Sequence, residues 1–230
     1  MKHKIFVTGD IHGDCDIHKL NSSNFPEGKN LTKKDYVIIA GDFGLLWSSP
    51  PDKTSLWWLN WLEKCPWTTL FVDGNHENHN ILNALETVKL FGSPAGKVND
   101  SVFHLRRGEL YKINRTKILT IGGAESIDKY RRTPGVSWWP EELLSSKEIN
   151  YILDKLPKIK TVDYVITHTC PTSAFEAMFP YNKKFNDPTM KFLEIVLEKL
   201  YFKHWYFGHF HEDMDFNNFT CLFNEVKQII

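Results

Sequence analysis

The strongest constraint on this chain comes from five short apolar runs, each of which stops abruptly at a glycine or a polar residue. They span residues 4–10, 35–42, 68–75, 163–168 and 204–209. A near-continuous apolar run of this length is typical of a β-strand that is covered on both faces. The runs therefore predict buried strands, and in a parallel-type sheet their carboxyl ends gather at one edge.

Helical patterns separate several of these strands. Residues 55–64 place leucines at helical spacing, and residues 140–156 open with a proline at a first helical position. Residues 187–200 begin with Asp187, a suitable N-cap before Pro188. Asn78 can cap a further helix. Strands that alternate with helices indicate the α/β class.

The middle of the chain alternates more regularly between polar and apolar residues. Residues 101–124 predict a β-meander with turns near Arg107–Gly108 and Asn114–Arg115. We find no internal repeat, low-complexity tract or Gly/Ser linker in the sequence. We therefore expect residues 1–230 to form a single domain.

Charge and cysteine usage exclude several functional classes. Lys plus Arg equals Asp plus Glu at 28 each, which argues against an extended nucleic-acid footprint or a membrane-surface protein. The four cysteines contain no CxxC pair and are expected to be reduced thiols. No apolar run reaches the roughly 18 residues that cross a bilayer, and the apolar run at the start is too short for a signal peptide. We expect a cytoplasmic protein, and make no prediction of its oligomeric state.

Polar side chains with metal-binding atoms occupy all five strand ends. The motifs are GDIHG, GDFG, GNHE, TH and GHFH, and they contain five of the ten histidines. A single motif of this kind is usually a turn or a structural hydrogen bonder, but five together point to one site. Carboxylate, amide and imidazole groups without a thiolate suit Mn, Fe, Zn or Mg. Two carboxylates, four histidines and one amide exceed the needs of one ion and suit two ions about 3.5–4 Å apart.

The ordered series of motifs over residues 9–211 resembles the calcineurin-like metallophosphoesterase superfamily. The resemblance implies a four-layer α-β-β-α sandwich, in which two mixed β-sheets are flanked by helices. It also implies a dinuclear metal centre at the strand ends, and hence a phosphatase or phosphodiesterase.

The resemblance further implies seven metal ligands. They are Asp10, His12 and His211 for the first metal, Asn75, His168 and His209 for the second, and Asp42 as the bridge. His76 is implied to face the substrate, where it protonates the leaving oxygen or stabilises the charged phosphorus centre. A metal-bridging hydroxide would attack the ester, because coordination can lower the pKa of water to about 7. The ions would be divalent or trivalent, with Mn expected first and Fe, Zn, Mg, Ni and Co as alternatives.

Departures from the family pattern bear on the substrate. Here the second motif reads GDFGLLW and the third DGNHE, without the Asp-Arg-Gly and the arginine that serine/threonine protein phosphatases carry there. We therefore expect a small phosphorylated molecule or a nucleotide as substrate, with a serine/threonine protein phosphatase as an alternative. A non-catalytic metal-binding scaffold of the same fold is a further alternative. Because the usual aspartate partner of the acidic histidine is missing, Glu77 is expected to orient His76.

Residues 124–142 form a candidate lid loop on the substrate side. The surrounding stretch is similar to one in small bacterial and phage-type members of the superfamily, and it joins a basic cluster to a tryptophan pair. In one interpretation Arg131 or Arg132 contacts the phosphate and nearby aromatic rings stack on the leaving group. In the other, the loop is solvated and Trp138 and Trp139 pack on the core.

Overall fold

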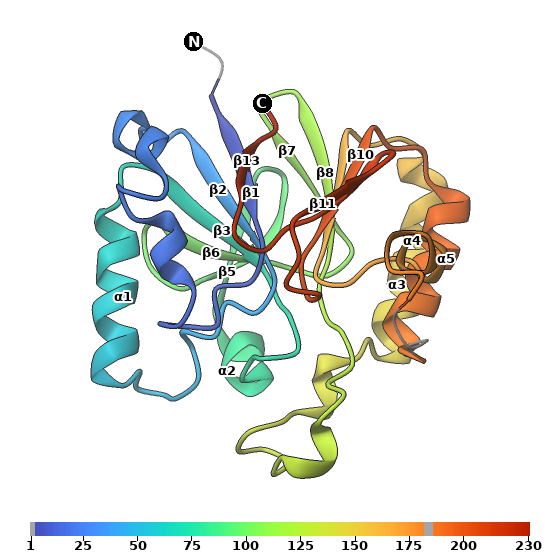
Figure 1. Cartoon of the computed structure of the whole chain (residues 1–230), viewed down its shortest axis with the longest axis horizontal. Coiled ribbons are helices and arrows are strands. Elements are labelled where there is room, and N and C mark those ends of the chain that lie inside the picture. The colour runs from blue at the N-terminus through green and yellow to red at the C-terminus, as the bar shows by residue number, and fades with distance from the viewer. Residues whose placement is uncertain (1–2, 182–185) are drawn as a thin grey trace.

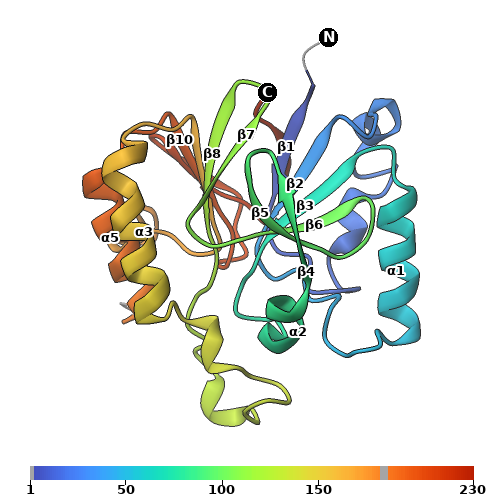
Figure 2. The same cartoon turned by 180° about the vertical axis from the view of Figure 1, so that it is seen from behind.

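The computed structural model describes residues 3–181 and 186–230, and in these residues two β-sheets pack face to face with helices on their outer sides (Figures 1 and 2). The first sheet contains, in spatial order, β13 (Val226–Gln228), β1 (Ile5–Thr8), β2 (Tyr36–Ala40), β3 (Thr68–Val72), β6 (Val102–Leu105), β5 (Ser93–Lys97) and β4 (Glu86–Leu90). The second contains β11 (Met214–Phe216), β12 (Phe219–Cys221), β10 (His204–Phe207), β9 (Tyr164–Thr167), β8 (Thr116–Ile121) and β7 (Glu109–Ile113). The predicted sandwich of two mixed sheets is confirmed.

The helices lie on opposite sides of the molecule. The first half supplies α1 (Lys53–Lys64) and α2 (His79–Ala84), and the second half supplies α3 (Ser146–Ile159), α4 (Thr172–Met178) and α5 (Pro188–Lys199). In Figure 1, α1 stands beside the first sheet, and α3, α4 and α5 stand beside the second. None of the helices in residues 3–181 and 186–230 is long and apolar enough to cross a membrane.

The apolar runs form strands because each of their faces meets a different apolar layer. In β2, Val37 and Ile39 pack in the cluster that includes α1, whereas Ile38 and Ala40 pack between the two sheets. All four side chains are fully buried. Burial of a side chain of this size contributes about 1.5–3 kcal/mol, so a continuous apolar run is favourable only where both faces are covered.

Two of the expected helices begin where their capping residues indicate. The side chain of Asp187 accepts a hydrogen bond from the backbone of Thr189 at the start of α5, and that of Asn78 accepts one from Ile81 at the start of α2. The helix expected over 140–156 begins later than predicted. Residues 140–142 form only a short 3-10 turn, because Ser145 and Glu148 make a reciprocal capping box that starts α3 at Ser146.

The meander expected over 101–124 is wrong in one respect. Its first strand, β6, pairs with β3 and β5 in the first sheet, whereas β7 and β8 form a hairpin in the second sheet. The chain crosses between the sheets near Gly108, which has a φ of 72°, and the hairpin turns at Asn114, which has a φ of 59°. Both turns were expected at these places, but alternation cannot tell which sheet a strand joins.

The carboxyl ends of the main strands converge at one edge of the sandwich. Strands β1, β2 and β3 run parallel in the first sheet, and β8, β9 and β10 run parallel in the second. The loops that follow these strands therefore lie on the same side of the molecule, which is where ligand sites form in such sheets. The yellow-green segment after β8 extends beyond this edge (Figure 1).

Candidate metal centre

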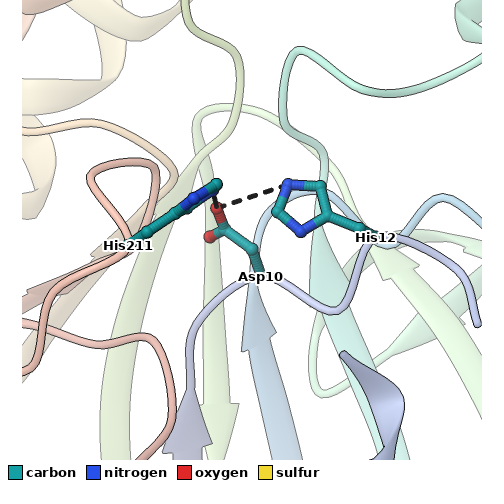
Figure 3. A group of neighbouring side chains, drawn as sticks. All are labelled: Asp10, His12 and His211. Carbon is teal, nitrogen blue, oxygen red and sulfur yellow. Dashed lines mark ion pairs between the residues drawn. The ribbon is translucent and has the colours of Figure 1, made fainter. Parts of the chain in front are cut away.

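Two buried aspartates form the middle of the site. Asp10 follows β1 and Asp42 follows β2, and their side chains are almost fully removed from solvent. His211 and His12 flank the Asp10 carboxylate on two sides (Figure 3), with their Nε2 atoms 3.3 and 3.9 Å from its Oδ2. Nε2 of His12 also lies 3.3 Å from Oδ2 of Asp42. Loops from three separate parts of the chain thus supply the residues predicted for the first metal.

The residues predicted for the second metal lie on the other side of Asp42. Nε2 of His168 is 3.0 Å from Oδ1 of Asn75 and 3.4 Å from Oδ1 of Asp42. The backbone N–H of His209 donates to the Asp10 carboxylate at 3.0 Å, and its ring centroid is 4.8 Å from that of His168. The other five predicted ligands therefore lie around the pair of aspartates.

The backbone of the site is strained. Four of the predicted ligands have a positive φ, namely His12 (42°), Asp42 (46°), His209 (71°) and His211 (54°). A non-glycine residue in this region costs roughly 1–3 kcal/mol and persists only where the surrounding structure holds it. Strain of this kind concentrates at functional sites.

Two glycines allow the backbone to touch the carboxylates. A Cβ atom at Gly74 would lie 2.0 Å from Oδ1 of Asp42, and one at Gly208 would lie 2.1 Å from Oδ1 of Asp10. Any side chain at these positions would displace a carboxylate. The glycines of the GNHE and GHFH motifs are therefore explained by close approach.

Hydrogen bonds on the outer side of the imidazoles fix which ring nitrogen faces the centre. Nδ1 of His12 lies 2.7 Å from Oδ2 of Asp16, and Nδ1 of His168 lies 3.0 Å from the carbonyl oxygen of Ala40. Both rings thereby turn Nε2 toward the aspartates. A carboxylate or carbonyl on the far nitrogen is the usual arrangement for a metal-binding histidine.

The contacts around His168 call for a cation. The Ala40 carbonyl can only accept, so Nδ1 of His168 donates to it, and in the neutral ring Nε2 carries a lone pair. This lone pair faces Oδ1 of Asn75 and Oδ1 of Asp42, which are also acceptors. Three acceptors this close repel one another unless a proton or a metal ion lies between them. The nitrogen and oxygen donors fit the borderline-to-hard divalent metals.

The electrostatics of the site agree with this requirement. Burial lowers the pKa of an imidazole, but the Asp42 and Asp10 carboxylates outweigh it and raise the pKa of His168 to about 10. For His12, burial is likewise outweighed, mainly by Asp42, and the pKa rises to about 9. His209 behaves differently: burial and the neighbouring His168 lower its pKa to about 3. The aspartates thus draw protons to two of the imidazoles.

Three groups of side chains in the described part of the chain could each hold a metal ion. In each group the donor atoms lie within 4.8 Å of one another; the groups are Asp10, His12 and His211, then His12, Asp42 and His76, and then Asp10, Asp42 and His168. His209 belongs to none of them, although its ring adjoins that of His168. The second group contains His76, which the sequence predicts to face the substrate.

Arg132 reaches the centre from the lid segment. Its guanidinium nitrogens lie 3.2 Å from both ring nitrogens of His76, and its Nε pairs with Asp128 at 2.8 Å. Arg131 instead lies over the ring of Tyr130, with its guanidinium carbon 5.2 Å from the centroid, and is exposed. Of the two arginines, only Arg132 is within reach of the site residues.

One member of the tryptophan pair, Trp139, packs against the body of the protein. Trp139 is buried and its ring meets that of Trp47 edge to face, with centroids 5.2 Å apart. Trp138 is partly buried. The segment therefore combines a packed tryptophan with an arginine at the site, and the two interpretations of the sequence each apply to part of it.

Glu77 does not have the contact expected of it. Its carboxylate accepts hydrogen bonds from the backbone of Phe43 at 2.7 Å and of Gly44 at 3.2 Å, and so it holds the loop that follows Asp42. Burial, reinforced by the Asp42 charge, raises the pKa of Glu77 to about 8. The contact to the His76 ring comes from Arg132 instead.

Three supporting residues escaped the sequence analysis. Asp16 follows His12 by four positions, a spacing that could have drawn notice. Ser126 and Glu142 bracket the lid segment, and Oγ of Ser126 lies 3.2 Å from Nδ2 of Asn75. No motif links these two residues to the strand ends, because only the fold brings them together.

Comparisons with known proteins agree with this geometry. A family model described as calcineurin-like phosphoesterase matches residues 3–213. A solved crystal structure is similar, with a TM-score of 0.57 over 96% of this chain and 90% of the other, at 12% identity, which shows a shared fold. No curated protein matches the sequence.

Proposed function

The chain belongs to the calcineurin-like phosphoesterase family, and from this premise we propose that it hydrolyses a phosphomonoester or phosphodiester with two bound metal ions. The observation that carries the proposal is the meeting of acceptor atoms around Asp42. Nε2 of His168 lies close to both Oδ1 of Asn75 and Oδ1 of Asp42, and Nε2 of His12 approaches the other carboxylate oxygen of Asp42. Such a set is favourable only with a proton or a metal ion between the acceptors, and a metal ion can take the place of the proton.

The proposed ligands divide into two sets that share Asp42. The first set is Asp10, His12 and His211, and the second is Asn75, His168 and His209. When bound, divalent ions would supply positive charge to the phosphoryl oxygens and acidify a water at neutral pH. Mn²⁺ is the first candidate, with Fe, Zn²⁺, Mg²⁺, Ni²⁺ and Co²⁺ as alternatives, because the same donors accept several metals.

His76 is proposed to act on the substrate and not as a ligand. Its backbone N–H donates to Oδ1 of Asp42 at 2.7 Å, which fixes the residue beside the centre. Burial lowers its pKa, Asp42 opposes the shift, and the Arg132 charge adds to the lowering. A neutral imidazole keeps one N–H, so stabilising a phosphoryl oxygen by hydrogen bonding suits His76 better than delivering a full proton from an imidazolium.

Arg132 is proposed to bind the phosphate. A guanidinium carries several donors in a fixed plane and binds a phosphoryl group through paired hydrogen bonds. Its present contact with His76 sets it next to the place where a phosphate would sit. Exchange of the imidazole for a phosphate oxygen would leave the ion pair with Asp128 intact.

A small phosphorylated molecule or a nucleotide is the proposed substrate class. The zero formal net charge provides no general attraction for a long polyanion. The lid segment offers the exposed Tyr130 beside Arg131 and Arg132, a surface on which a compact leaving group could stack.

The direct test is hydrolysis of aryl phosphate monoesters and diesters by metal-stripped protein to which Mn²⁺ or another divalent ion is returned. We expect metal-dependent turnover of at least one ester class, abolished by EDTA. Inactivity of the metal-loaded protein on both classes, together with unimpaired metal binding, would favour the non-catalytic scaffold. A panel of nucleotides, cyclic nucleotides and phosphopeptides then separates the substrate classes.

Substitution of His76 tests its assignment. His76→Ala should keep both metal ions and lose roughly 10²–10⁴ in rate, the usual worth of a positioned acid–base group. His18→Ala is the matched control, because that imidazole is exposed and packs edge to face on Trp58. Loss of metal from His76→Ala would instead make His76 a ligand, as the group it forms with His12 and Asp42 permits.

A further inference from the structure

We propose that Ser126 and Glu142 act as positioning residues that orient the side-chain amide of Asn75 and so determine the filling of the second metal position. This inference rests on the proposed function, because it assigns these residues to a metal that the function requires. Neither residue belongs to the strand-end motifs. Both belong to the lid segment, one near each of its ends.

A continuous chain of hydrogen bonds links the three side chains. Nδ2 of Asn75 donates to Oγ of Ser126 at 3.2 Å, and Oγ of Ser126 donates to Oε2 of Glu142 at 2.6 Å. The backbone N–H of Ser126 donates to the other carboxylate oxygen, Oε1, at 2.9 Å. Each donor in this chain therefore has one acceptor.

The direction of the chain follows from its far end. A carboxylate has no hydrogen to give, so the hydroxyl of Ser126 must donate to Glu142. Oγ of Ser126 is then free to accept, and the atom of Asn75 that faces it must be the donor Nδ2. The amide oxygen Oδ1 is consequently turned toward His168 and the centre, which is the orientation a metal ligand needs.

Burial makes this orientation hard to reverse. Glu142 is fully buried and Ser126 is 2% exposed, so neither finds a replacement partner in water. A flipped Asn75 would set its acceptor against the lone pairs of Ser126 and leave two buried groups without partners. Each such group costs about 1–3 kcal/mol.

The same contacts attach the lid segment to the centre. Ser126 lies just after β8, and Glu142 ends the 3-10 turn before α3, so their hydrogen bonds close the base of the intervening loop. Arg132 contacts His76 farther along this loop. The loop is thus joined to two adjacent residues of the GNHE motif, one at its base and one near its tip.

Glu142→Gln is the sharpest test because it preserves the shape of the side chain and reverses the direction of its hydrogen bond with the hydroxyl of Ser126. In this variant the amide oxygen of the introduced side chain must face the backbone N–H of Ser126, so its NH₂ group faces Oγ, and the serine hydroxyl is driven toward Asn75. The Asn75 amide then turns its NH₂ toward the metal position. By calorimetry with Mn²⁺ alone, we expect two equivalents for the unmodified protein and a roughly 10–100-fold weaker affinity for one of them in the variant.

Control variants separate positioning from general damage. Glu141→Gln makes the same change at the adjacent, exposed glutamate and should leave both affinities unchanged. Ser126→Ala should weaken the same equivalent as Glu142→Gln, and the double variant should be less than additive because both act through one chain. Ser137→Ala, in the same loop but bonded to the backbone of Thr133, is its control. Burial raises the pKa of Glu142, so the titrations are run on the alkaline side of neutrality, which favours the charged carboxylate.

The outcomes are distinct. Selective weakening of one equivalent in both relay variants, with unaltered melting of the metal-free proteins, supports the proposal. Unchanged affinities for both equivalents in Glu142→Gln and Ser126→Ala overturn it while leaving the phosphoesterase intact. Absence of Mn²⁺ binding by the unmodified protein overturns the proposed function, and this inference with it.

Discussion

Two groups of buried carboxylates and imidazoles adjoin at the third motif, where Asp73 precedes Asn75 by two residues, yet they differ in how their charges are balanced. One is the candidate metal centre around Asp10 and Asp42. The other, which we call the Asp73 cluster, consists of Asp73, His104 and Arg107. Oδ2 of Asp73 accepts from Nε of Arg107 at 2.8 Å, and Oδ1 lies 3.0 Å from Nε2 of His104.

The two groups differ in that the carboxylate of the Asp73 cluster is paired with an arginine, a permanently charged side chain. In the Asp73 cluster, Arg107 balances the carboxylate and, against the effect of burial, holds the pKa of Asp73 well below its usual range. Burial, which outweighs the pull of Asp73, lowers the pKa of His104, so this imidazole is neutral. Among the described residues, the ion pairs of Asp10 and Asp42 are made with histidines. A buried acid therefore indicates a metal site only where the chain itself does not neutralise it.

The largest expected effect comes from the bridging position. Asp42→Asn preserves the acceptor for the His76 backbone but removes the charge shared by both metal sets. We expect a fall in kcat/KM of roughly 10³–10⁴, which corresponds to the several kcal/mol that metal ions contribute to a phosphoryl transition state. The measurement is aryl phosphate hydrolysis at saturating Mn²⁺.

The metal-free form supplies the control for this substitution. With EDTA present, Asp42→Asn should melt within a few degrees of the unmodified protein, because the pairing lost with His12 and His168 is offset by relief of the repulsion between Asp42 and Asp10. A variant that is active, or one that unfolds without metal, would show that Asp42 has the structural role of Asp73.

The second expected effect is on stability and not on activity, and it comes from the Asp73 cluster. Arg107→Ala removes the internal cation of the Asp73 cluster and leaves a buried carboxylate unpaired. We expect the free energy of unfolding to fall by about 3–5 kcal/mol, measured by urea denaturation with EDTA present. Mn²⁺ affinity per folded molecule should fall less than in Asp42→Asn, because Arg107 contacts no predicted ligand and reaches the centre only indirectly, through the backbone carbonyl of Glu142.

A paired substitution checks the cause of this loss. Asp73→Asn together with Arg107→Met removes both charges and should recover much of the lost stability, since replacing a buried ion pair costs less than breaking it. Equal instability of the single and double variants would attribute the effect to lost packing or to the other contacts of Arg107, with Glu148 and the carbonyls of Glu141, Glu142 and Leu143.

The sequence predicted which strand-end residues lie together better than it predicted the parts that surround them. Each strand end is marked in the sequence by an apolar run that stops at Asp, Asn or His. To predict that the five motifs lie together, one needs only the rule that parallel strands end at one edge of the sheet. By contrast, β6 and β7 show the same alternation, and nothing in it tells that one joins the first sheet and the other the second. Sheet membership depends on contacts distant in sequence.

The side chains of the lid segment show the same limit. Arg131 and Arg132 are adjacent and chemically identical, so no local pattern distinguishes them. The short 3-10 turn Lys129–Arg131 places Arg132 beside His76 and leaves Arg131 on the surface. The expected role of Glu77 also failed at this level, since its partners were set by the path of the loop after Asp42.

Metal removal gives the third effect. At a free Mn²⁺ concentration of 100 times Kd, each filled position should stabilise the protein by about 2.7 kcal/mol through mass action. For a chain of this length that is a rise in Tm of roughly 5–11 °C per site. The rise should disappear in Asp42→Asn and persist in Asp73→Asn with Arg107→Met, and the opposite pattern would interchange the roles of the two groups.

The smallest expected effect is the release of protons when the metal binds. At pH 7.5 the imidazoles of His12 and His168 in the metal-free protein should each carry a second ring proton, because their pKa values of about 9 and 10 lie above that pH. A metal ion needs the neutral imidazole, so its binding should release about two protons and its affinity should rise with pH up to about 10. Calorimetry of Mn²⁺ binding in buffers of different ionisation enthalpy counts them.

The same pKa values fix the sign of the stability change. Since both exceed the unfolded value of about 6.5, their contribution to the metal-free protein is complete below pH 6.5 and is lost as pH rises to about 10. Asp73 has a depressed pKa, so its contribution is present above about pH 4 and is lost only in acid. At pH 7.5 neither Asp73 nor His104 titrates, so a proton release on metal binding at that pH comes from the candidate centre and from Glu77 beside it, whose pKa is about 8. No release at that pH would mean that the two imidazoles are already neutral and that the carboxylates are balanced by another charge.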